Sequence, residues 1–319
     1  MGVDSSVLVT AIGSFSSSAV LPNLARAGFR IVGCDIYPRN WIASSLEVDS
    51  FYQVPMASNE AGYIQAIEQI VRDESIDYII PLTDYEVDVI SPAREKISAT
   101  SCISPKDAVS LCRDKRMTFK IVEQLFPDMA IPTYSAHEFR NDETLDVGMW
   151  VCKPCNGRSS SGLFKAKDRA SALSYLESVD DDFIVQPLVL GDVVTVDIVR
   201  DPDRDSVIAL ARKELLRTPN GAGTSVYVFR DLELEERCRE IAGALNVRGC
   251  VNFEFICTEK GSYHFLECNP RFAGGVSFSC AYGYDFVLNH LRCFAGYPIE
   301  GLERTDGQYI ARRYTDYLL

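Results

Sequence analysis

Apolar, strand-like runs alternate with helical runs through roughly the first 100 residues of the chain. Residues 6–12, 30–35 and 77–81 form short, mostly apolar runs, which are typical of strands buried in a parallel sheet. Between them, residues 16–27 and 61–73 carry apolar side chains at helical spacing. This alternation predicts a parallel, doubly wound sheet in an α/β domain.

The pattern changes after residue 104. Residues 105–126 are expected to form one helix, because a proline stands at its start. After Pro132, short strands outnumber helices, which indicates an α+β region with antiparallel sheet. The expected strands are residues 149–153, 163–167, 183–189, 193–200 and 206–216 with a hairpin at 251–268, and the expected helices are residues 168–179, 232–246 and 284–294.

Composition narrows the classes of function. Hydrophobic residues make up 47% of the chain and charged residues 24%, so the chain can bury a large core and is not disordered. No apolar run reaches the ~18 residues of a membrane span, and no basic segment precedes residues 7–12 as in an export signal. We therefore expect a cytoplasmic protein without a membrane partner. The net charge of −13 repels phosphate backbones and disfavours nucleic acid as a partner.

The 11 cysteines are expected to be reduced thiols, and several lie in apolar runs where a thiol acts as a small hydrophobe. Cys152 and Cys155 form a C-x-x-C pair, but no second pair has matching spacing, so a zinc site is not expected. The 3 histidines are far apart in the sequence and are interpreted as structural.

Two glutamates in the predicted hairpin carry the strongest chemical signal. If residues 259–262 close the turn, Glu254 lies directly opposite Glu267, and Asn252 lies opposite Asn269. Like charges directly opposite each other destabilise a sheet. We therefore expect a cation between the two carboxylates, and a hard divalent ion suits such oxygen ligands.

Arg271 follows Glu267 and Asn269 at intervals of two, so the three share one face if the strand continues. A guanidinium there suits the transferring end of a metal-bound polyphosphate. The alternative is an ordinary solvated hairpin face. The aromatic residues of both strands favour a buried hairpin.

A second signal is Lys153, which ends an apolar strand and precedes a loop of small residues at 156–162. In such loops backbone N–H groups can approach phosphate oxygens, and the lysine adds a positive charge. The order of residues is not that of a Walker loop, and a flexible surface loop is the alternative.

Two weaker features lie in the first domain. Residues 10–18 have one glycine where the dinucleotide-binding fingerprint has three, so a tight turn between strand and helix is favoured. Residues 83–86 follow a predicted parallel strand, where α/β sheets bind ligands, so they are a candidate substrate site; an acidic helix start is the alternative.

Taken in order, these elements resemble the ATP-grasp superfamily, and most closely the large chain of carbamoyl-phosphate synthase and its stand-alone relatives. The likeness covers nearly the whole chain and depends on Lys115, on Lys153 with its loop, and on the E-x-N-P-R motif that begins at Glu267. It implies a fold that is α/β and α+β. The implied divisions are a Rossmann-like domain at 1–104, a linking helix with a small lid subdomain at 105–188, and a C-terminal subdomain with the Mg/ATP site at 189–319.

The resemblance also implies roles for individual residues. Glu254, Glu267 and Asn269 would hold two Mg²⁺ ions, with Mn²⁺ as a substitute, and Arg271 would be the catalytic residue that steadies the transferring phosphoryl group. The implied contacts to ATP are Lys115, Lys153, Ser159, Ser160, Gln186, Leu188, Val189 and Asp192.

The sequence departs from the family near Asp192, which stands beside the position of a ribose-binding glutamate. Whether Asp192 replaces that glutamate is left open, because neighbouring strand residues face opposite ways. A further cation for the phosphates is Arg212, Lys213 or Arg217, and the sequence does not choose among them.

The activity that the resemblance implies is ATP-dependent joining of a carboxylate to an amine through an acyl phosphate. The expected partners are these two small-molecule substrates, and a homodimer is left open. The alternatives are a carbamate-forming or phosphorylating ATP-grasp enzyme, or a nucleotide-binding protein without catalysis.

Overall fold

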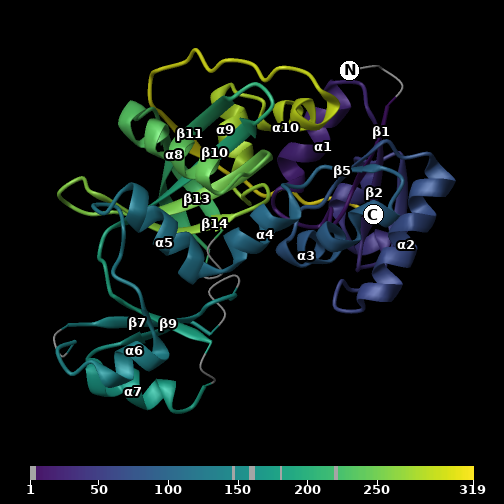
Figure 1. The fold of residues 1–319 in the computed structure, drawn as a ribbon. Helices are drawn as coiled ribbons and strands as arrows, with labels where there is room; N and C mark the ends of the chain where they lie inside the picture. The colour runs from purple at the N-terminus through teal and green to yellow at the C-terminus, as the bar shows by residue number, and fades with distance from the viewer. Residues whose placement is uncertain (1–4, 146–147, 158–161, 180–181, 219–221) are drawn as a thin grey trace.

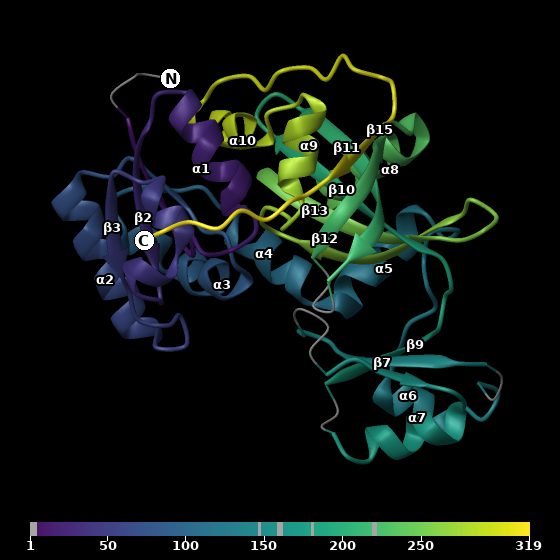
Figure 2. The same ribbon diagram turned by 180° about the vertical axis from the view of Figure 1, so that it is seen from behind.

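The computed structural model describes residues 5–145, 148–157, 162–179, 182–218 and 222–319, and within them the strands form three sheets (Figure 1 and Figure 2). The first sheet is parallel and the other two are antiparallel. The predicted combination of an α/β part and an α+β part is therefore confirmed.

The first sheet has the order β3-β2-β1-β4-β5. Its strands are β1 (Ser6–Val9), β2 (Arg30–Asp35), β3 (Ser50–Gln53), β4 (Tyr78–Ile80) and β5 (Thr100–Ser101), and its helices are α1 (Ser17–Arg26), α2 (Glu60–Glu74), α3 (Asp84–Ala93) and the short 3-10 turns η1 (Arg39–Trp41), η2 (Ala43–Leu46) and η3 (Arg94–Lys96). Since β1 lies between β2 and β4, the order of the sheet reverses there. The loops after β1 and β4 therefore meet at the carboxyl edge of the sheet, where α/β folds bind ligands.

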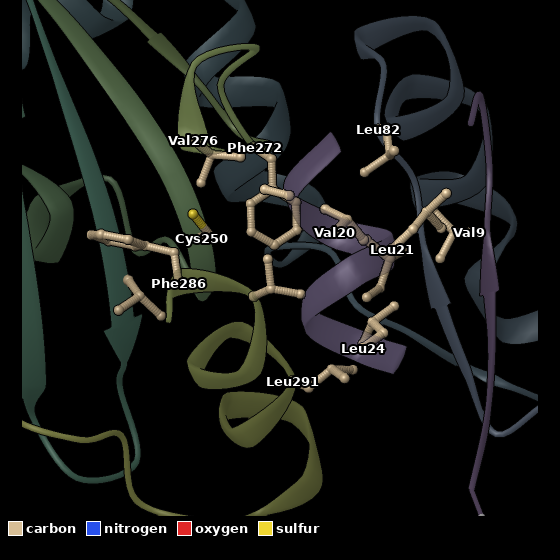
Figure 3. Packing of buried hydrophobic residues seen from close by; sticks show 14 of the residues in the cluster. Val9, Val20, Leu21, Leu24, Leu82, Cys250, Phe272, Val276, Phe286 and Leu291 are labelled. Carbon is tan, nitrogen blue, oxygen red and sulfur yellow. The ribbon is translucent and has the colours of Figure 1, made fainter. Parts of the chain in front are cut away.

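Helix α1 packs against both the first sheet and the C-terminal part of the chain. Val20, Leu21 and Leu24 are buried in one cluster with Phe272 and Leu291 (Figure 3). Full burial of side chains of this size contributes about 1.5–3 kcal/mol each. This cluster joins the first domain to the third sheet.

The single helix expected at residues 105–126 is wrong, because the segment forms two helices, α4 (Lys106–Arg113) and α5 (Lys115–Leu125). Asp114 has extended backbone angles, φ −80° and ψ 99°, and its side chain accepts hydrogen bonds from the backbone N–H groups of Arg116 and Met117. Aspartate is a strong helix N-cap, so it begins a new helix here. As a result, Lys115 is the first residue of α5.

The second sheet has the order β6-β9-β7-β8 and belongs to a small subdomain that projects from the rest of the molecule (Figure 1). Its elements are β6 (Tyr134–Ser135), β7 (Trp150–Pro154), β8 (Phe164–Ala166), β9 (Phe183–Pro187), α6 (Ala136–Asn141) and α7 (Arg169–Leu176). Trp150 packs edge-on against Phe139 of α6, with ring centroids 4.8 Å apart, inside the subdomain's own buried cluster. The subdomain therefore has a core separate from that of the third sheet.

The third sheet has the order β14-β13-β10-β11-β12-β15. Its elements are β10 (Asp192–Asp201), β11 (Ser206–Arg217), β12 (Gly223–Phe229), β13 (Gly249–Cys257), β14 (Tyr263–Asn269), β15 (Gln308–Ala311), α8 (Leu232–Ala244), α9 (Val276–Tyr282) and α10 (Phe286–Ala295). One face packs against α4, α5 and α8, and the other against α9 and α10. Both linking helices thus belong to the core of this sheet.

The predicted hairpin is present, but its turn is longer than expected. Tyr263 pairs with Cys257 rather than with Thr258, which shifts the register by one residue. A bulge at Leu266 then restores the register, so that Glu267 lies opposite Glu254 as predicted.

Several short elements were not predicted from the sequence. These are β3, β5, β6, β12, β15, α6, α9 and the three 3-10 turns, whereas the start of α3 at Asp84 agrees with the alternative given for residues 83–86. In the part of the chain that the structure describes, none of the helices combines the length and apolar character needed to cross a bilayer.

Candidate functional site

Glu254 and Glu267 are direct cross-strand partners on β13 and β14. Phe253 and Phe255 are completely buried in the cluster that includes α5 and α8. Because successive side chains on a strand point to opposite faces, Glu254 points to the other face of the sheet. Cross-strand partners have Cβ atoms about 4.5–5.5 Å apart, so one cation can contact both carboxylates.

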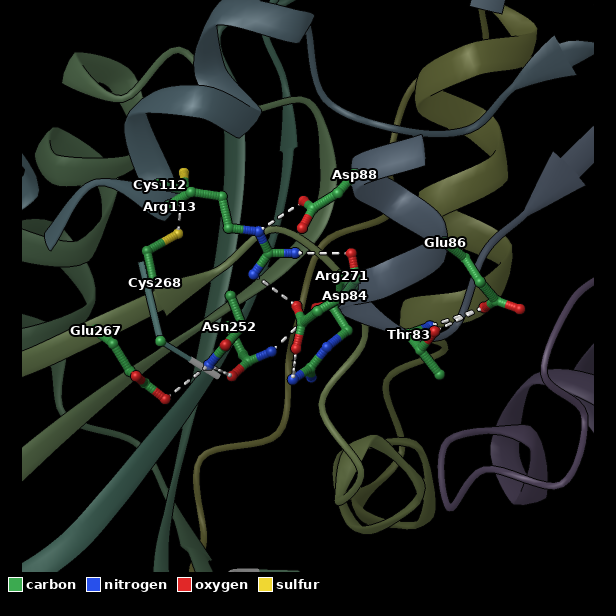
Figure 4. A network of polar contacts seen from close by, with 12 residues as sticks. Thr83, Asp84, Glu86, Asp88, Cys112, Arg113, Asn252, Glu267, Cys268 and Arg271 are labelled. Carbon is green, nitrogen blue, oxygen red and sulfur yellow. Dashed lines mark hydrogen bonds and ion pairs between the residues drawn. The ribbon is translucent and has the colours of Figure 1, made fainter. Parts of the chain in front are cut away.

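Asn252 and Asn269 form the neighbouring cross-strand pair. Asn269 Nδ2 donates to Asn252 Oδ1 at 3.2 Å and to Glu267 Oε1 at 3.3 Å. Asn252 Nδ2 donates to the carbonyl oxygen of Arg271 at 3.0 Å. The two amides therefore fix both the Glu267 carboxylate and the segment that follows β14 (Figure 4).

The pKa of Glu254 is raised to about 7, first by burial and then by the negative charge of Glu267. Arg217 opposes this effect, with its Nη2 atom 3.6 Å from Glu254 Oε2. So high a pKa means that the surroundings hold too little positive charge to stabilise the ionised carboxylate. A cation between the two glutamates would supply it.

The residues at this pair fit Mg²⁺. Two carboxylates and the amide of Asn269 are oxygen ligands of the kind that a hard cation prefers, and phosphates and water usually complete its shell. Within the described ranges, no group of three or more His, Cys, Asp or Glu side chains is placed to hold a metal ion. Cys152 and Cys155 are buried thiols.

Lys115 and Lys153 both lie close to the glutamate pair. Lys115 Nζ is 4.0 Å from Glu267 Oε2 and donates to the carbonyl oxygen of Gly157 at 2.7 Å. Lys153 is 8% exposed, and burial lowers its pKa to about 8, although Glu267 opposes this effect. Ser159 and Ser160, the predicted phosphate contacts of the loop after Lys153, lie outside the described residues.

The other predicted ATP contacts lie on β9 and just beyond it. Gln186 is buried, and its Nε2 atom donates to Thr133 Oγ1 at 2.7 Å. Leu188 and Val189 are partly exposed. Asp192 is exposed and pairs with Lys213, with 2.6 Å between Asp192 Oδ2 and Lys213 Nζ.

The structure separates the three cations among which the sequence did not choose. Arg212 is 1% exposed and bonds to Asp197, Ser279 and Glu214. Lys213 points to the other side of β11, toward Asp192. Arg217 lies beside Glu254, so it is the cation of the three in contact with the glutamate pair.

The expectation that the strand continues to Arg271 is wrong, because β14 ends at Asn269. The Arg271 side chain instead reaches the first domain, where Nη2 donates to Asp84 Oδ2 at 2.7 Å. Its Nη1 atom donates to the carbonyl oxygen of Phe272 at 3.0 Å. The proline at position 270 lacks the N–H group that would extend the ladder.

Asp84 is held by a second arginine as well. Arg113 Nη1 lies 2.7 Å from Asp84 Oδ1, and Arg113 Nε donates to Asp88 Oδ1 at 2.8 Å (Figure 4). Burial alone would raise the pKa of Asp84, but the charges of Arg271 and Arg113 hold it well below the usual range. Asp84 is therefore ionised at neutral pH. Sequence reasoning missed Arg113, because no local motif links it to a residue so far away in the chain.

A cleft of about 540 Å³ brings these groups together. One wall comes from the carboxyl edge of the first sheet, at residues 13–16 and 82–85, and the other from the third sheet. The charged side chains of its lining are Asp84, Arg212, Glu214, Arg217, Glu254, Glu267 and Arg271. The acidic Glu214 was not singled out from the sequence, since nothing local distinguishes it.

Two loops of the first domain that were singled out from the sequence, the turn after β1 and residues 83–86, lie at the cleft. The turn after β1 is a tight one, in which the Gly13 N–H donates to Asp35 Oδ2 at 2.8 Å, and it also lines the cleft. Of residues 83–86, the first three line the cleft, whereas Glu86 turns into the domain and accepts hydrogen bonds from Thr83 and Tyr63.

Two family models match different parts of the chain. Residues 179–313 match the family described as ATP-grasp in the biosynthetic pathway with Ter operon. Residues 7–104 match the PylC-like N-terminal domain. A search of curated proteins finds no match.

Solved structures with the same fold include several ATP-grasp enzymes. The biotin carboxylase domain of Hydrogenobacter thermophilus 2-oxoglutarate carboxylase, a dimer in complex with MgADP, ADP and bicarbonate, has a TM-score of 0.75 at 15% identity, and the match covers 94% of this chain and 71% of that one. N5-carboxyaminoimidazole synthetase from Staphylococcus aureus with ADP has a TM-score of 0.72 at 13% identity, covering 93% and 78%. An L-amino acid ligase from Bacillus licheniformis has a TM-score of 0.70 at 14% identity, covering 91% and 74%. The chain therefore has the fold of these ATP-grasp enzymes, with residues 179–313 matching an ATP-grasp family and residues 7–104 matching the PylC-like N-terminal domain.

Proposed function

We propose that the chain is an ATP-dependent carboxylate–amine ligase that activates the carboxylate as an acyl phosphate. The observation that carries this proposal is the arrangement of Glu254, Glu267 and Arg271 around one cleft, with Lys115 and Lys153 close to the glutamate pair. Acidic metal ligands, lysines and a guanidinium together suit phosphoryl transfer, in which catalysis depends on positioning and charge stabilisation.

Each group has a separate task in this proposal. Lys115 and Lys153 bind the phosphates of ATP, and Glu254 and Glu267, with Asn269, hold Mg²⁺. When bound, Mg²⁺ neutralises phosphate charge and orients the polyphosphate. Arg271 binds the phosphoryl group as it moves to the carboxylate and stabilises the charge that develops.

The remaining sequence-based assignments are part of the same proposal. Ser159 and Ser160 close over the phosphates, Gln186 to Val189 line the adenine, and Asp192 lies near the ribose. Two metal ions and a homodimer are likewise proposed. The division of the chain at residues 1–104, 105–188 and 189–319 completes the proposal.

The cleft gives a place for the activated intermediate. A carboxylate does not acylate an amine at neutral pH until one of its oxygens becomes a leaving group, and the acyl phosphate must then be kept from water. The wall formed by residues 13–16 and 82–85 faces the glutamate pair across the cleft. We assign the recognition of the carboxylate and the amine to this wall.

A second candidate is a reaction in which bicarbonate takes the place of an organic carboxylate. The observation that favours it is the fold shared with a biotin carboxylase domain in complex with bicarbonate. A nucleotide-binding protein without catalysis is disfavoured, because Glu254, Glu267, Asn269 and Arg271 are all present around the cleft.

A screen of phosphate release from MgATP tests the proposal. Amino acids and small carboxylates are offered in pairs with amines, and hydroxylamine is added to convert any acyl phosphate into a hydroxamate. We expect release that requires the carboxylate and a hydroxamate that requires ATP, with Glu267→Gln inactive as the matched control. Release with bicarbonate alone would favour the second candidate, and nucleotide binding without release with any partner would exclude both reactions.

A further inference from the structure

Asp84 occupies an unusual place for an acidic side chain. It is the first residue of α3, four positions after the end of β4, and only 6% of it is exposed. Thr83 and Glu86 form the capping box of that helix, so Asp84 is not needed to cap it. Its carboxylate points instead out of the first domain toward two arginines (Figure 4).

The two arginines come from different parts of the chain. Arg113 is the last residue of α4 and Arg271 follows β14, and each guanidinium lies 2.7 Å from a different oxygen of Asp84. One buried carboxylate thus holds two guanidinium groups that would otherwise repel each other. Asp88 accepts from Arg113 as well, but the contacts of the described residues do not join it to Arg271.

Arg271 depends on such a partner for its position. Because β14 ends at Asn269, ladder hydrogen bonds do not hold the backbone at Arg271. Its carbonyl oxygen accepts a hydrogen bond from Asn252 instead, and the orientation of the side chain depends on the partners of the guanidinium. Among the described residues, its guanidinium makes two hydrogen bonds, one to Asp84 and one to the Phe272 carbonyl oxygen. Five N–H groups are present on a guanidinium, so donors remain for a ligand in the cleft that Arg271 lines.

We infer that Asp84 is the positioning residue for Arg271: it holds the guanidinium at the wall of the cleft in the orientation in which the remaining N–H groups meet the transferring phosphoryl group. This inference rests on the proposed function. The carboxylate acts through Arg271, and substrate recognition is left to the other residues of the wall at 13–16 and 82–85. It also links the first domain, which supplies the substrate wall, to the group that stabilises the reaction.

The test compares Asp84→Ala, Arg271→Ala and the double variant, using MgATP, hydroxylamine and the best carboxylate from the screen. A misplaced guanidinium loses most of its effect, so Asp84→Ala should lower kcat on the order of 10²-fold, with KM for MgATP changed less than about threefold. The double variant should be no slower than Arg271→Ala, because both changes remove the same interaction. Multiplied effects in the double variant would overturn the inference.

Asp88→Asn is the matched control. It removes the same charge from the same helix and weakens the same Arg113, yet it leaves the contact between Asp84 and Arg271 in place. It should keep kcat within about threefold of the wild-type value. An equal loss in Asp84→Asn and Asp88→Asn would assign the effect to Arg113 and to the fold, and would contradict the inference.

Chemical rescue gives a readout that does not depend on stability. Guanidinium ion at non-denaturing concentration should restore part of the activity of Arg271→Ala, because Asp84 offers it the binding site that Arg271 left. The same addition should not rescue the double variant; rescue of both would overturn the inference. If the wild type releases no phosphate with any carboxylate, the proposed function fails first, and that result is distinguishable from failure of the Asp84 variants alone.

Discussion

The ammonium group of Lys153 lies over the ring of Phe119, 4.9 Å from the ring centroid. Lys153 belongs to β7 of the small subdomain, and Phe119 belongs to α5, which packs on the third sheet. A cation held against an aromatic face in a buried place gains cation–π energy but loses hydration. The charged lysine therefore lies at the junction of two parts of the fold. A bound polyphosphate there would replace the stabilisation by water that the ammonium group loses on burial.

Replacing Lys153 with methionine should stabilise the nucleotide-free protein. Lys153 is buried, and its pKa is about 8 instead of the ordinary 10.5. Below pH 8 the free energy of folding therefore includes the unfavourable burial of a protonated lysine. A difference of 2.5 units corresponds to an effect on the order of 3 kcal/mol. Chemical unfolding at neutral pH, with and without MgATP, measures it: the variant should unfold at higher denaturant concentration, and MgATP should stabilise it much less than the wild type.

The advantage of the methionine variant should shrink as the pH rises from 8 toward 10.5. The pKa of Lys153 is lowered in the folded state, so the cost is fully present below the folded value and disappears once the unfolded lysine is also neutral. An advantage that stays constant across this interval would contradict the assignment of the cost to this group.

MgATP binding should weaken as the pH rises above about 8. Lys153 in the nucleotide-free protein loses its proton there, and the neutral amine attracts phosphate less strongly. Calorimetric titration between pH 7 and 9.5 should show a falling affinity in the wild type. Lys153→Arg keeps its charge through this range and should show a flatter profile, so parallel profiles in the two proteins would assign the pH dependence to another group.

Arg271→Ala should lower kcat far more than it weakens ATP binding. An interaction made mainly in the transition state reduces kcat when it is removed, whereas one made equally before the reaction raises KM. The loss of one preorganised charge stabiliser is worth on the order of 10²-fold or more. Steady-state phosphate release and calorimetry with MgATP measure the two effects.

Arg271→Lys serves as the control for that change, because it keeps the charge but loses the planar fork that can bind Asp84 and a phosphoryl oxygen together. It should recover little of the lost rate. Unchanged kcat with abolished nucleotide binding in Arg271→Ala would make Arg271 an ATP anchor and remove it from the reaction step.

Asp114→Ala should destabilise the protein and weaken MgATP binding together. Asp114 caps α5 through two backbone N–H groups, and Lys115 is the first residue of that helix. Loss of such a cap costs about 1 kcal/mol. Thermal unfolding and calorimetry measure both effects, and Asp114→Asn, which keeps a capping side chain, should restore most of each; if asparagine does no better than alanine, the cap is not what places Lys115.

The sequence allowed the architecture and the glutamate pair to be predicted, because both depend on local pattern. Strand and helix periodicity located β2 and α2 closely, and counting outward from a turn placed Glu254 opposite Glu267. The break between α4 and α5 was not predicted. It depends on one capping residue, Asp114, inside a stretch whose pattern is otherwise helical.

The contacts between distant segments could not be predicted in this way. Asp84 and Arg271 are 187 positions apart, and their contact follows from how the first domain packs on the third sheet. Short edge strands such as β6 and β15 were not predicted, because a run of two to four residues is too short to show a strand periodicity. Their strand state is set by pairing partners rather than by their own residues.

The five-residue turn and the bulge at Leu266 compensate for each other. The longer turn shifts the pairing register by one residue, so that Tyr263 pairs with Cys257. The bulge shifts the register back before Glu267, which therefore pairs with Glu254. A four-residue turn followed by an unbroken ladder would place the same two glutamates opposite each other. The two hairpins contain the same residues between the glutamates and present the same glutamate pair, so a shift of Thr258 from the turn into the strand need not disturb that pair, provided that the bulge is lost with it.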